Sequence, residues 1–150
     1  MRLILVSAAA AVLALMPGVV PSAEADSDGQ VRTQSGKLRC IVSANDVSHG
    51  GGPLVVCQHS DSSPFPSSPM SEEYHSQLNL AVVRGNGALS WDIGNLPGSS
   101  EALMDDTVLS YGQTYRINGW TILSNTDGTR FTNDNTGHGM FINVDAVEPF

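Results

Sequence analysis

Two short apolar stretches decide the fold: Leu38-Arg39-Cys40-Ile41-Val42-Ser43 and Leu54-Val55-Val56-Cys57-Gln58. In the first, every second residue from Leu38 onward can face a core, which is the period of a half-buried β-strand. The second stretch is equally strand-like. Gly50-Gly51-Gly52-Pro53 lies between them and is a strong turn signal. We therefore predict a β-hairpin with a long loop.

The chain has two cysteines, Cys40 and Cys57, and each lies in one of these predicted strands. An even cysteine count in an exported protein usually means a disulfide. Closing a loop of this length stabilises by about 3 kcal/mol in the chain-entropy model. A metal or redox pair is the alternative, but neither cysteine belongs to a C-x-x-C motif. We predict a structural Cys40–Cys57 disulfide.

Export is predicted from residues 1–25. Arg2 precedes an uncharged apolar run from Leu3 to Met16, and Ala23-Glu24-Ala25 supplies small residues at the usual cleavage spacing. This pattern is typical of a secretory signal peptide, and the run is too short for a comfortable membrane span. We predict cleavage after Ala25, a mature protein without a membrane span, and a secreted, extracellular or cell-wall location.

The charge balance limits the class of partner. The chain has 15 acidic and 7 basic residues, a net charge of -8 at pH 7, and a single lysine. Nucleic-acid binding needs cations that displace counterions from phosphates, so nucleic acid is not an expected partner. Anionic membrane surfaces would repel such a chain. The expected partner is an unknown protein or small molecule, bound by a monomer that needs no cofactor.

The rest of the chain is rich in turn residues. Residues 26–37 are polar and are predicted to be a loose lead-in, and residues 38–150 a single β domain. Eight or nine short antiparallel strands at roughly ten-residue spacing predict a small β-sandwich or barrel. Arg84-Gly85-Asn86-Gly87 predicts a tight hairpin. The Ser- and Pro-rich segment 60–71 is expected to be a surface loop.

Weak helical turns are expected at two places, around 71–74 and around 101–104. Both are short segments without a sustained helical period.

The order of several segments points to a family. Gln34-Ser35-Gly36 leads into Leu38-Arg39-Cys40, Val108-Leu109-Ser110-Tyr111-Gly112 comes later, and Thr136-Gly137-His138-Gly139-Met140-Phe141 precedes a final aromatic residue. This order resembles an uncharacterised family of small exported proteins of mycobacteria and related actinobacteria. The resemblance covers most of the mature chain. It implies export, a β fold and one disulfide, but it supplies no activity.

The chain departs from this family pattern at one pair of positions. Members often carry a second cysteine pair where Ile122 and Phe131 stand here. An apolar cross-strand pair can replace a disulfide only where the two Cβ atoms are close. The resemblance therefore implies that Ile122 and Phe131 lie on neighbouring strands.

Thr136-Gly137-His138-Gly139 is the best candidate for a site. Glycines on both sides could expose the ring of His138, which could then act as a base or a metal ligand. Asp134 lies just before it, so a small hydrolase or metal-dependent enzyme using His138 with Asp134 is the alternative function. In the competing interpretation, the glycines serve a turn or bulge and the histidine bonds to the backbone.

Two acidic clusters are further candidates for a site. Glu72 and His75 could share one face of a turn and hold a metal, with His59 as a further ligand, but zinc needs three or four ligands. A solvated loop is the competing interpretation. Asp105-Asp106 is an acidic pair that fits turn chemistry better than a site.

Aromatic residues give the last candidates. Trp91, Trp120 and Tyr111 could form a ligand-binding platform, or they could form the core of so lean a chain. The sequence has no Gly-x-Ser-x-Gly nucleophile motif. The leading hypothesis is therefore a non-enzymatic binding or interaction module.

Overall fold

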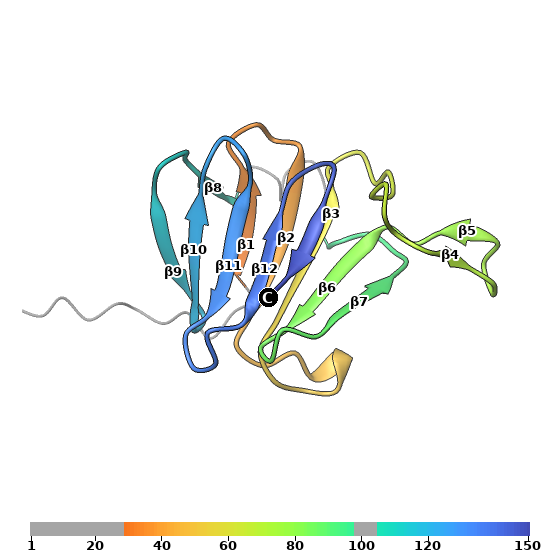
Figure 1. The fold of residues 1–150 in the computed structure, drawn as a ribbon, viewed down its shortest axis with the longest axis horizontal. Coiled ribbons are helices and arrows are strands. Elements are labelled where there is room, and N and C mark those ends of the chain that lie inside the picture. Colours follow the sequence, from red (N-terminus) through yellow and green to blue (C-terminus); the bar gives the residue numbers. More distant parts are fainter. Residues whose placement is uncertain (1–28, 98–104) are drawn as a thin grey trace, which may run out of the picture.

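The computed structural model describes residues 29–97 and 105–150 and shows an all-β protein (Figure 1). The predicted fold class is confirmed, but the described residues form thirteen strands rather than eight or nine. The additional strands are short and polar or contain proline. Their extended form comes from pairing with neighbours and not from an apolar pattern. They are β1 (Gly29–Thr33), β4 (Met70–Ser71), β5 (Ser76–Gln77) and β13 (Val147–Pro149).

The larger sheet has six strands in the order β7-β6-β3-β2-β1-β8. All neighbours are antiparallel except β1 and β8, which run parallel and so depart from the predicted antiparallel arrangement. The β6–β7 pair is the tight hairpin predicted at Arg84-Gly85-Asn86-Gly87. The strands not yet located are β2 (Leu38–Ser43), β3 (Leu54–His59), β6 (Leu80–Arg84), β7 (Leu89–Asp92) and β8 (Thr107–Leu109).

The second sheet has five antiparallel strands in the order β13-β12-β11-β10-β9. Ile122 in β10 lies directly opposite Phe131 in β11, and both are fully buried. The neighbouring position that the family resemblance implied for this pair is confirmed. The remaining strands are β9 (Thr114–Ile117), β10 (Trp120–Ser124), β11 (Thr129–Asn133) and β12 (Gly139–Ile142).

The two sheets pack face to face as a sandwich, and one continuous core fills the space between them (Figure 1). Trp120 is fully buried there, and its indole N–H donates to the carbonyl of Ser43 in the opposite sheet at 3.2 Å. The predicted Cys40–Cys57 disulfide is confirmed and joins directly opposed residues of β2 and β3. Both cysteines are buried in the same core, so the bridge fastens the inner face of the larger sheet.

The larger sheet buries apolar side chains on its outer face as well. Leu54, Val56, Leu80 and Val82 form a second cluster there, covered by Leu96 from the segment after β7. Strands buried on both faces are continuous apolar runs rather than alternating ones. This explains why β3 and β6 lack the alternation of a one-sided sheet.

A buried ion pair lies on the outer face of the larger sheet, toward its β8 edge. The Arg39 Nε donates to the Asp106 carboxylate at 2.7 Å, and its Nη2 donates to the second oxygen at 3.1 Å. The Asp106 side chain is fully buried. Asp105 and Asp106 lie in the turn just before β8. Asp106 also joins the start of β8 to β2, a long-range role that the interpretation as turn chemistry does not include.

Four further predictions concern the ends and loops of the chain. The loose lead-in predicted for 26–37 is wrong from Gly29 onward, because β1 pairs with β2 and with β8 and buries Val31. A helical turn expected around 71–74 is instead the turn of the β4–β5 hairpin (Figure 1). The signal peptide at 1–25 and the turn at 101–104 lie outside the described residues.

Within the part of the chain that the structure describes, no helix has the length and apolar character needed to cross a membrane. The only helix there is the single 3-10 turn η1 (Val47–His49) in the loop between β2 and β3.

Candidate functional site

The segment 136–139 covers the end of the turn between β11 and β12 and the first residue of β12, Gly139. The Thr136 hydroxyl donates to the carbonyl of Gly85 in the β6–β7 turn, which fastens the two sheets at this end. The His138 ring is exposed, and its Nδ1 lies 3.2 Å from the carbonyl oxygen of Phe150. The structure therefore matches the interpretation in which the glycines serve a turn and the histidine bonds to the backbone.

Asp134 points to different partners from the same turn. Its carboxylate accepts a hydrogen bond from the Thr121 hydroxyl at 2.5 Å and lies 4.0 Å from Nη1 of Arg116. Asp134 and His138 share no contact partner, and no hydrogen bond joins them in the described structure. The pairing needed for the enzyme hypothesis thus finds no support in the geometry.

The second glycine of this segment is required by space. A Cβ on Gly139 would lie 1.8 Å from the carbonyl oxygen of Phe131, which is backbone and cannot swing aside. We expect Gly139→Ala to lower the free energy of unfolding by about 1–3 kcal/mol through overpacking. Urea denaturation measures this.

Gly137→Ala is the matched control for this prediction. Gly137 has φ +74 with nothing within 4 Å of its Cβ position, so only backbone strain opposes alanine there. A smaller loss is expected, and an equal loss at both positions would contradict the steric explanation.

The metal candidates lie apart from any further ligand. Glu72 and His75 sit in the exposed turn of the β4–β5 hairpin. Over residues 29–97 and 105–150, no group of three His, Cys, Asp or Glu side chains is placed to hold a metal ion.

The three aromatic candidates occupy three environments. Trp120 is fully buried, and Trp91 is half-buried with its ring 5.8 Å from that of Phe65. Tyr111 is 36% exposed and lines a hollow at one end of the sandwich. Of the three, Tyr111 is the aromatic that a ligand could reach most directly.

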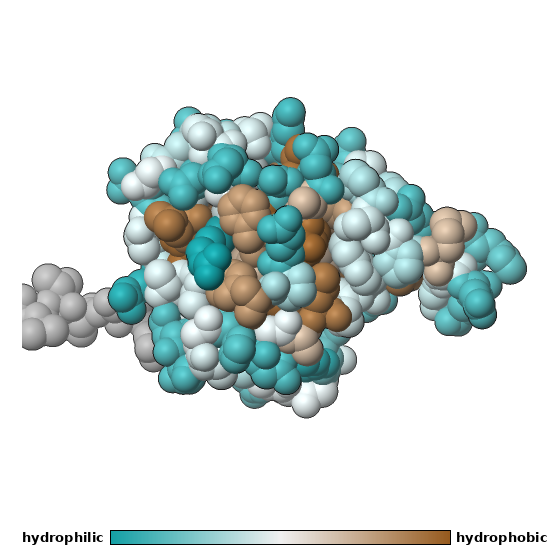
Figure 2. Space-filling view, in the orientation of Figure 1, coloured by the Kyte–Doolittle hydropathy of each residue, from teal (hydrophilic) through white to brown (hydrophobic). Residues whose placement is uncertain are grey.

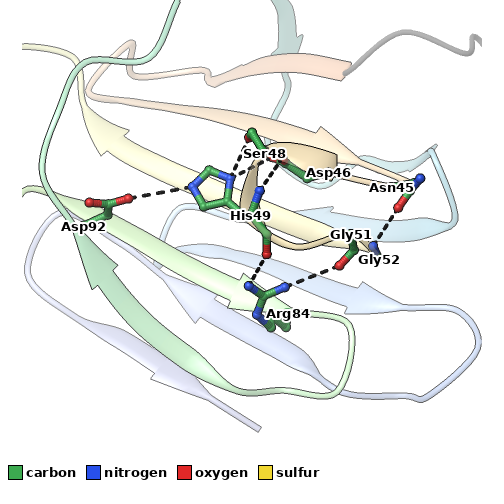
Figure 3. A network of polar contacts seen from close by, with 8 residues as sticks. All are labelled: Asn45, Asp46, Ser48, His49, Gly51, Gly52, Arg84 and Asp92. Atoms are coloured by element: carbon green, nitrogen blue, oxygen red, sulfur yellow. Dashed lines mark hydrogen bonds and ion pairs between the residues drawn. The ribbon is translucent and has the colours of Figure 1, made fainter.

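A network of polar contacts lies at the opposite end of the sandwich, around the β2–β3 loop (Figure 3). The Ser48 hydroxyl donates to Asp46 at 2.5 Å, and His49 Nδ1 lies 3.1 Å from both Ser48 Oγ and Asp46 Oδ2. Nε2 of His49 lies 3.7 Å from Asp92. Asp46, His49 and Ser48 are the residue types of a catalytic triad. Whether Ser48 could act as a nucleophile depends on which group accepts its hydroxyl proton.

The network serves the loop and not a nucleophile. The only hydroxyl proton of Ser48 is donated to Asp46, so His49 is not placed to accept it. The N–H groups of Gly50, Gly51 and Gly52 all donate within the loop, which leaves no oxyanion hole there. Burial alone would raise the pKa of the Asp46 carboxyl, but hydrogen bonds from Ser48 and His49 outweigh it and lower the pKa.

Tyr111 belongs to a groove at the other end of the sandwich. The β1–β2 turn, the β10–β11 turn and the loops after β3 and β12 meet there, at the top of Figure 1. A hollow of about 200 Å³ beside Tyr111 adjoins an open hollow of about 390 Å³ beside His59, and the two share Lys37 and Val144. We call the two hollows together the end groove.

Hydrogen bonds fasten the walls of the end groove. The Tyr111 backbone N–H donates to the side-chain oxygen of Gln34 at 2.8 Å, and the Asn143 amide donates to the carbonyl of Asp127 at 3.0 Å. The Ser60 N–H donates to the carbonyl of Lys37 at 2.8 Å. The groove is therefore a fixed feature built from both sheets.

His59 holds the floor of the larger hollow. Its Nε2 lies 2.9 Å from the carbonyl oxygen of Val144, its Nδ1 lies 2.9 Å from the Ser63 hydroxyl, and its ring packs at 4.2 Å on Phe65. Ser63 in turn donates its hydroxyl and its N–H to Asp61, and these two hydrogen bonds lower the pKa of the Asp61 carboxyl.

Sequence reasoning named His59 only as an additional metal ligand and missed this role. Val144, its partner through Nε2, lies 85 residues further along the chain. No local spacing signals such a contact.

Comparison of the chain with protein-family models, with curated proteins and with solved structures finds no match.

Proposed function

We propose that this protein is an exported, non-enzymatic binding module that holds an oligosaccharide carrying a negatively charged group in the end groove. The signal-like residues 1–25 and the disulfide support export, since disulfides persist in oxidising compartments. The segment order and the Ile122–Phe131 pairing support membership of the exported actinobacterial family.

The observation that carries the proposal is the position of Lys37. The single lysine of the chain stands at the β1–β2 turn, on the boundary between the two hollows, and its side chain is exposed. In the described residues no carboxylate lies within ion-pair distance of it. An ammonium group at this point can bind a carboxylate or phosphate of a ligand.

The lining around Lys37 suits a sugar. The smaller hollow presents the hydroxyl and amide side chains of Ser35, Asn125 and Thr126. Such groups both donate and accept hydrogen bonds, as sugar hydroxyls do. The ring of Tyr111 adds an apolar face with a polar tip, on which a sugar ring can pack.

Isothermal titration of the mature protein tests this proposal with two probes, an oligomer of galacturonic acid and the neutral galactose oligomer of equal length. The acidic oligomer is expected to bind more tightly. Lys37→Gln and Tyr111→Ala should each weaken its binding about tenfold, as the loss of one good contact does. Both side chains are exposed, so neither change should unfold the domain.

Arg116→Gln is the matched control, because it removes an exposed positive charge that lies outside the groove lining. It should leave the affinity unchanged. Equal binding of the two oligomers, no binding of either, or the same loss with Arg116→Gln would each overturn the proposal.

A further inference from the structure

A two-stranded hairpin projects from the sandwich. Strands β4 and β5 pair only with each other in the described structure and stand away from both larger sheets (Figure 1). We call residues 70–77 the arm. Met70 and Tyr74 are 65% and 56% exposed, and the side chains of Glu72 and Glu73 are exposed between them. The arm therefore offers two apolar side chains beside two carboxylates.

Hydrogen bonds and a buried side chain fix the base of the arm, whereas the side chains at its tip are exposed. An isolated two-stranded hairpin is at best marginally stable in water. Here Phe65 is fully buried just before the arm, and the Gln77 amide donates to the carbonyls of Phe65 and Ser68 at 3.0 and 2.9 Å. The N–H of Leu78 donates to the carbonyl of Pro69 at 2.9 Å. The arm is thus held in a fixed direction.

The outer face of the five-stranded sheet carries positive charges and apolar side chains, whereas the arm carries negative charges. The guanidinium of Arg130 lies 3.6 Å over the centroid of the Phe150 ring. Leu123 and Phe141 flank Arg130 in register on the neighbouring strands. Arg116 is exposed on β9 of the same sheet. We call these five residues the platform; Figure 2 shows apolar and hydrophilic side chains interleaved on this side of the molecule.

The guanidinium of Arg130 is ready for a carboxylate. Stacking on the Phe150 ring fixes its plane, and none of the described carboxylates lies within ion-pair distance of it. A guanidinium held in this way is pre-organised for a bidentate carboxylate contact. Arg116 has one described ion pair, to Asp134 at 4.0 Å, and its side chain is 76% exposed.

We propose that the arm of one copy of this chain docks on the platform of a second copy. The two surfaces are complementary: Glu72 and Glu73 match the two guanidinium groups, and Met70 and Tyr74 match the apolar side chains of the platform. Methionine packs favourably against aromatic rings such as Phe141. The arm projects away from its own platform, so the contact joins different molecules (Figure 1).

This contact is heterologous, because two different surfaces meet, and it generates rings or open chains of molecules rather than isologous dimers. The arm tip is small, so the interface belongs to the weak class and a Kd on the order of 0.1–1 mM is expected. A monomer at low concentration, as the sequence predicts, is compatible with assembly where the protein is concentrated.

Sedimentation velocity of the mature protein over a concentration series tests the proposal. The average mass is expected to rise with concentration and to fall again when salt is added, since exposed ion pairs are screened. Glu72→Lys/Glu73→Lys, the arm variant, and Arg116→Glu/Arg130→Glu, the platform variant, should each weaken self-association at least about tenfold. All four side chains are exposed, so folding should be retained, as circular dichroism checks.

The mixture of the two variants is decisive. The arm variant keeps an intact platform and the platform variant keeps an intact arm, so together they should form a one-to-one dimer that does not grow. Asp127→Lys/Asp145→Lys makes the same change in net charge as the arm variant at two exposed loop residues and should associate like the wild type. A wild type that stays monomeric, a mixture that stays monomeric, or association that persists in both variants would overturn the proposal.

Discussion

Asp106→Ala is expected to lower the free energy of unfolding by about 3–5 kcal/mol, because it leaves the Arg39 guanidinium in the protein interior without a counter-charge. The Asp106 side chain is fully buried, and the Arg39 side chain is 10% exposed. Two hydrogen bonds to the guanidinium are lost with the carboxylate. A domain of this size is stabilised by about 5–15 kcal/mol in total, so the effect should be large in urea denaturation.

Two further variants show whether the effect comes from the buried ion pair or from the loss of a carboxylate in this turn. Asp105→Ala removes the adjacent, exposed carboxylate and should change stability by no more than about 0.5 kcal/mol. Arg39→Met/Asp106→Leu removes both charges and should recover most of the loss, since a buried ion pair can often be exchanged for apolar side chains. If Asp106→Ala behaved like Asp105→Ala, the ion pair would not stabilise the connection between β2 and the start of β8.

The parts of the fold that could be predicted from sequence are those with local signals. The two cysteine strands, the β6–β7 hairpin and the disulfide depend on alternation, turn residues and cysteine count. The opposed positions of Ile122 and Phe131 followed from the family resemblance. Each of these features needs only neighbouring residues or a known pattern.

Strand β1 shows why other parts could not be predicted. Its sequence, Gly29-Gln30-Val31-Arg32-Thr33, has one aliphatic residue and no apolar alternation. It is a strand because β2 and β8 supply partners on both sides, and β8 begins more than seventy residues later. Long-range pairing of this kind overrides local propensity.

The candidate site also combines residues with a local sequence signal and residues that only long-range contacts bring together. The sequence left Tyr111 and Trp120 open as ligand contacts or core residues, and the structure places Trp120 in the core and exposes Tyr111. The flanking glycines made His138 a candidate in the sequence. In the structure those glycines are needed for the turn geometry and for the close approach of the backbone. The end groove depends instead on loops brought together by the sandwich, such as those of Lys37 and Val144.

The buried disulfide leads to the last prediction. Cys40→Ala/Cys57→Ala is expected to lower the free energy of unfolding by about 3 kcal/mol, because the unfolded chain is no longer constrained by the loop across the 17-residue separation of Cys40 and Cys57. The loss of two buried sulfur atoms from the core adds to it. Urea denaturation of the variant and of the wild type, with and without reductant, measures both parts. If reductant did not lower the stability of the wild type, the bridge would contribute little and the packing of the cysteine side chains would account for the loss in the variant.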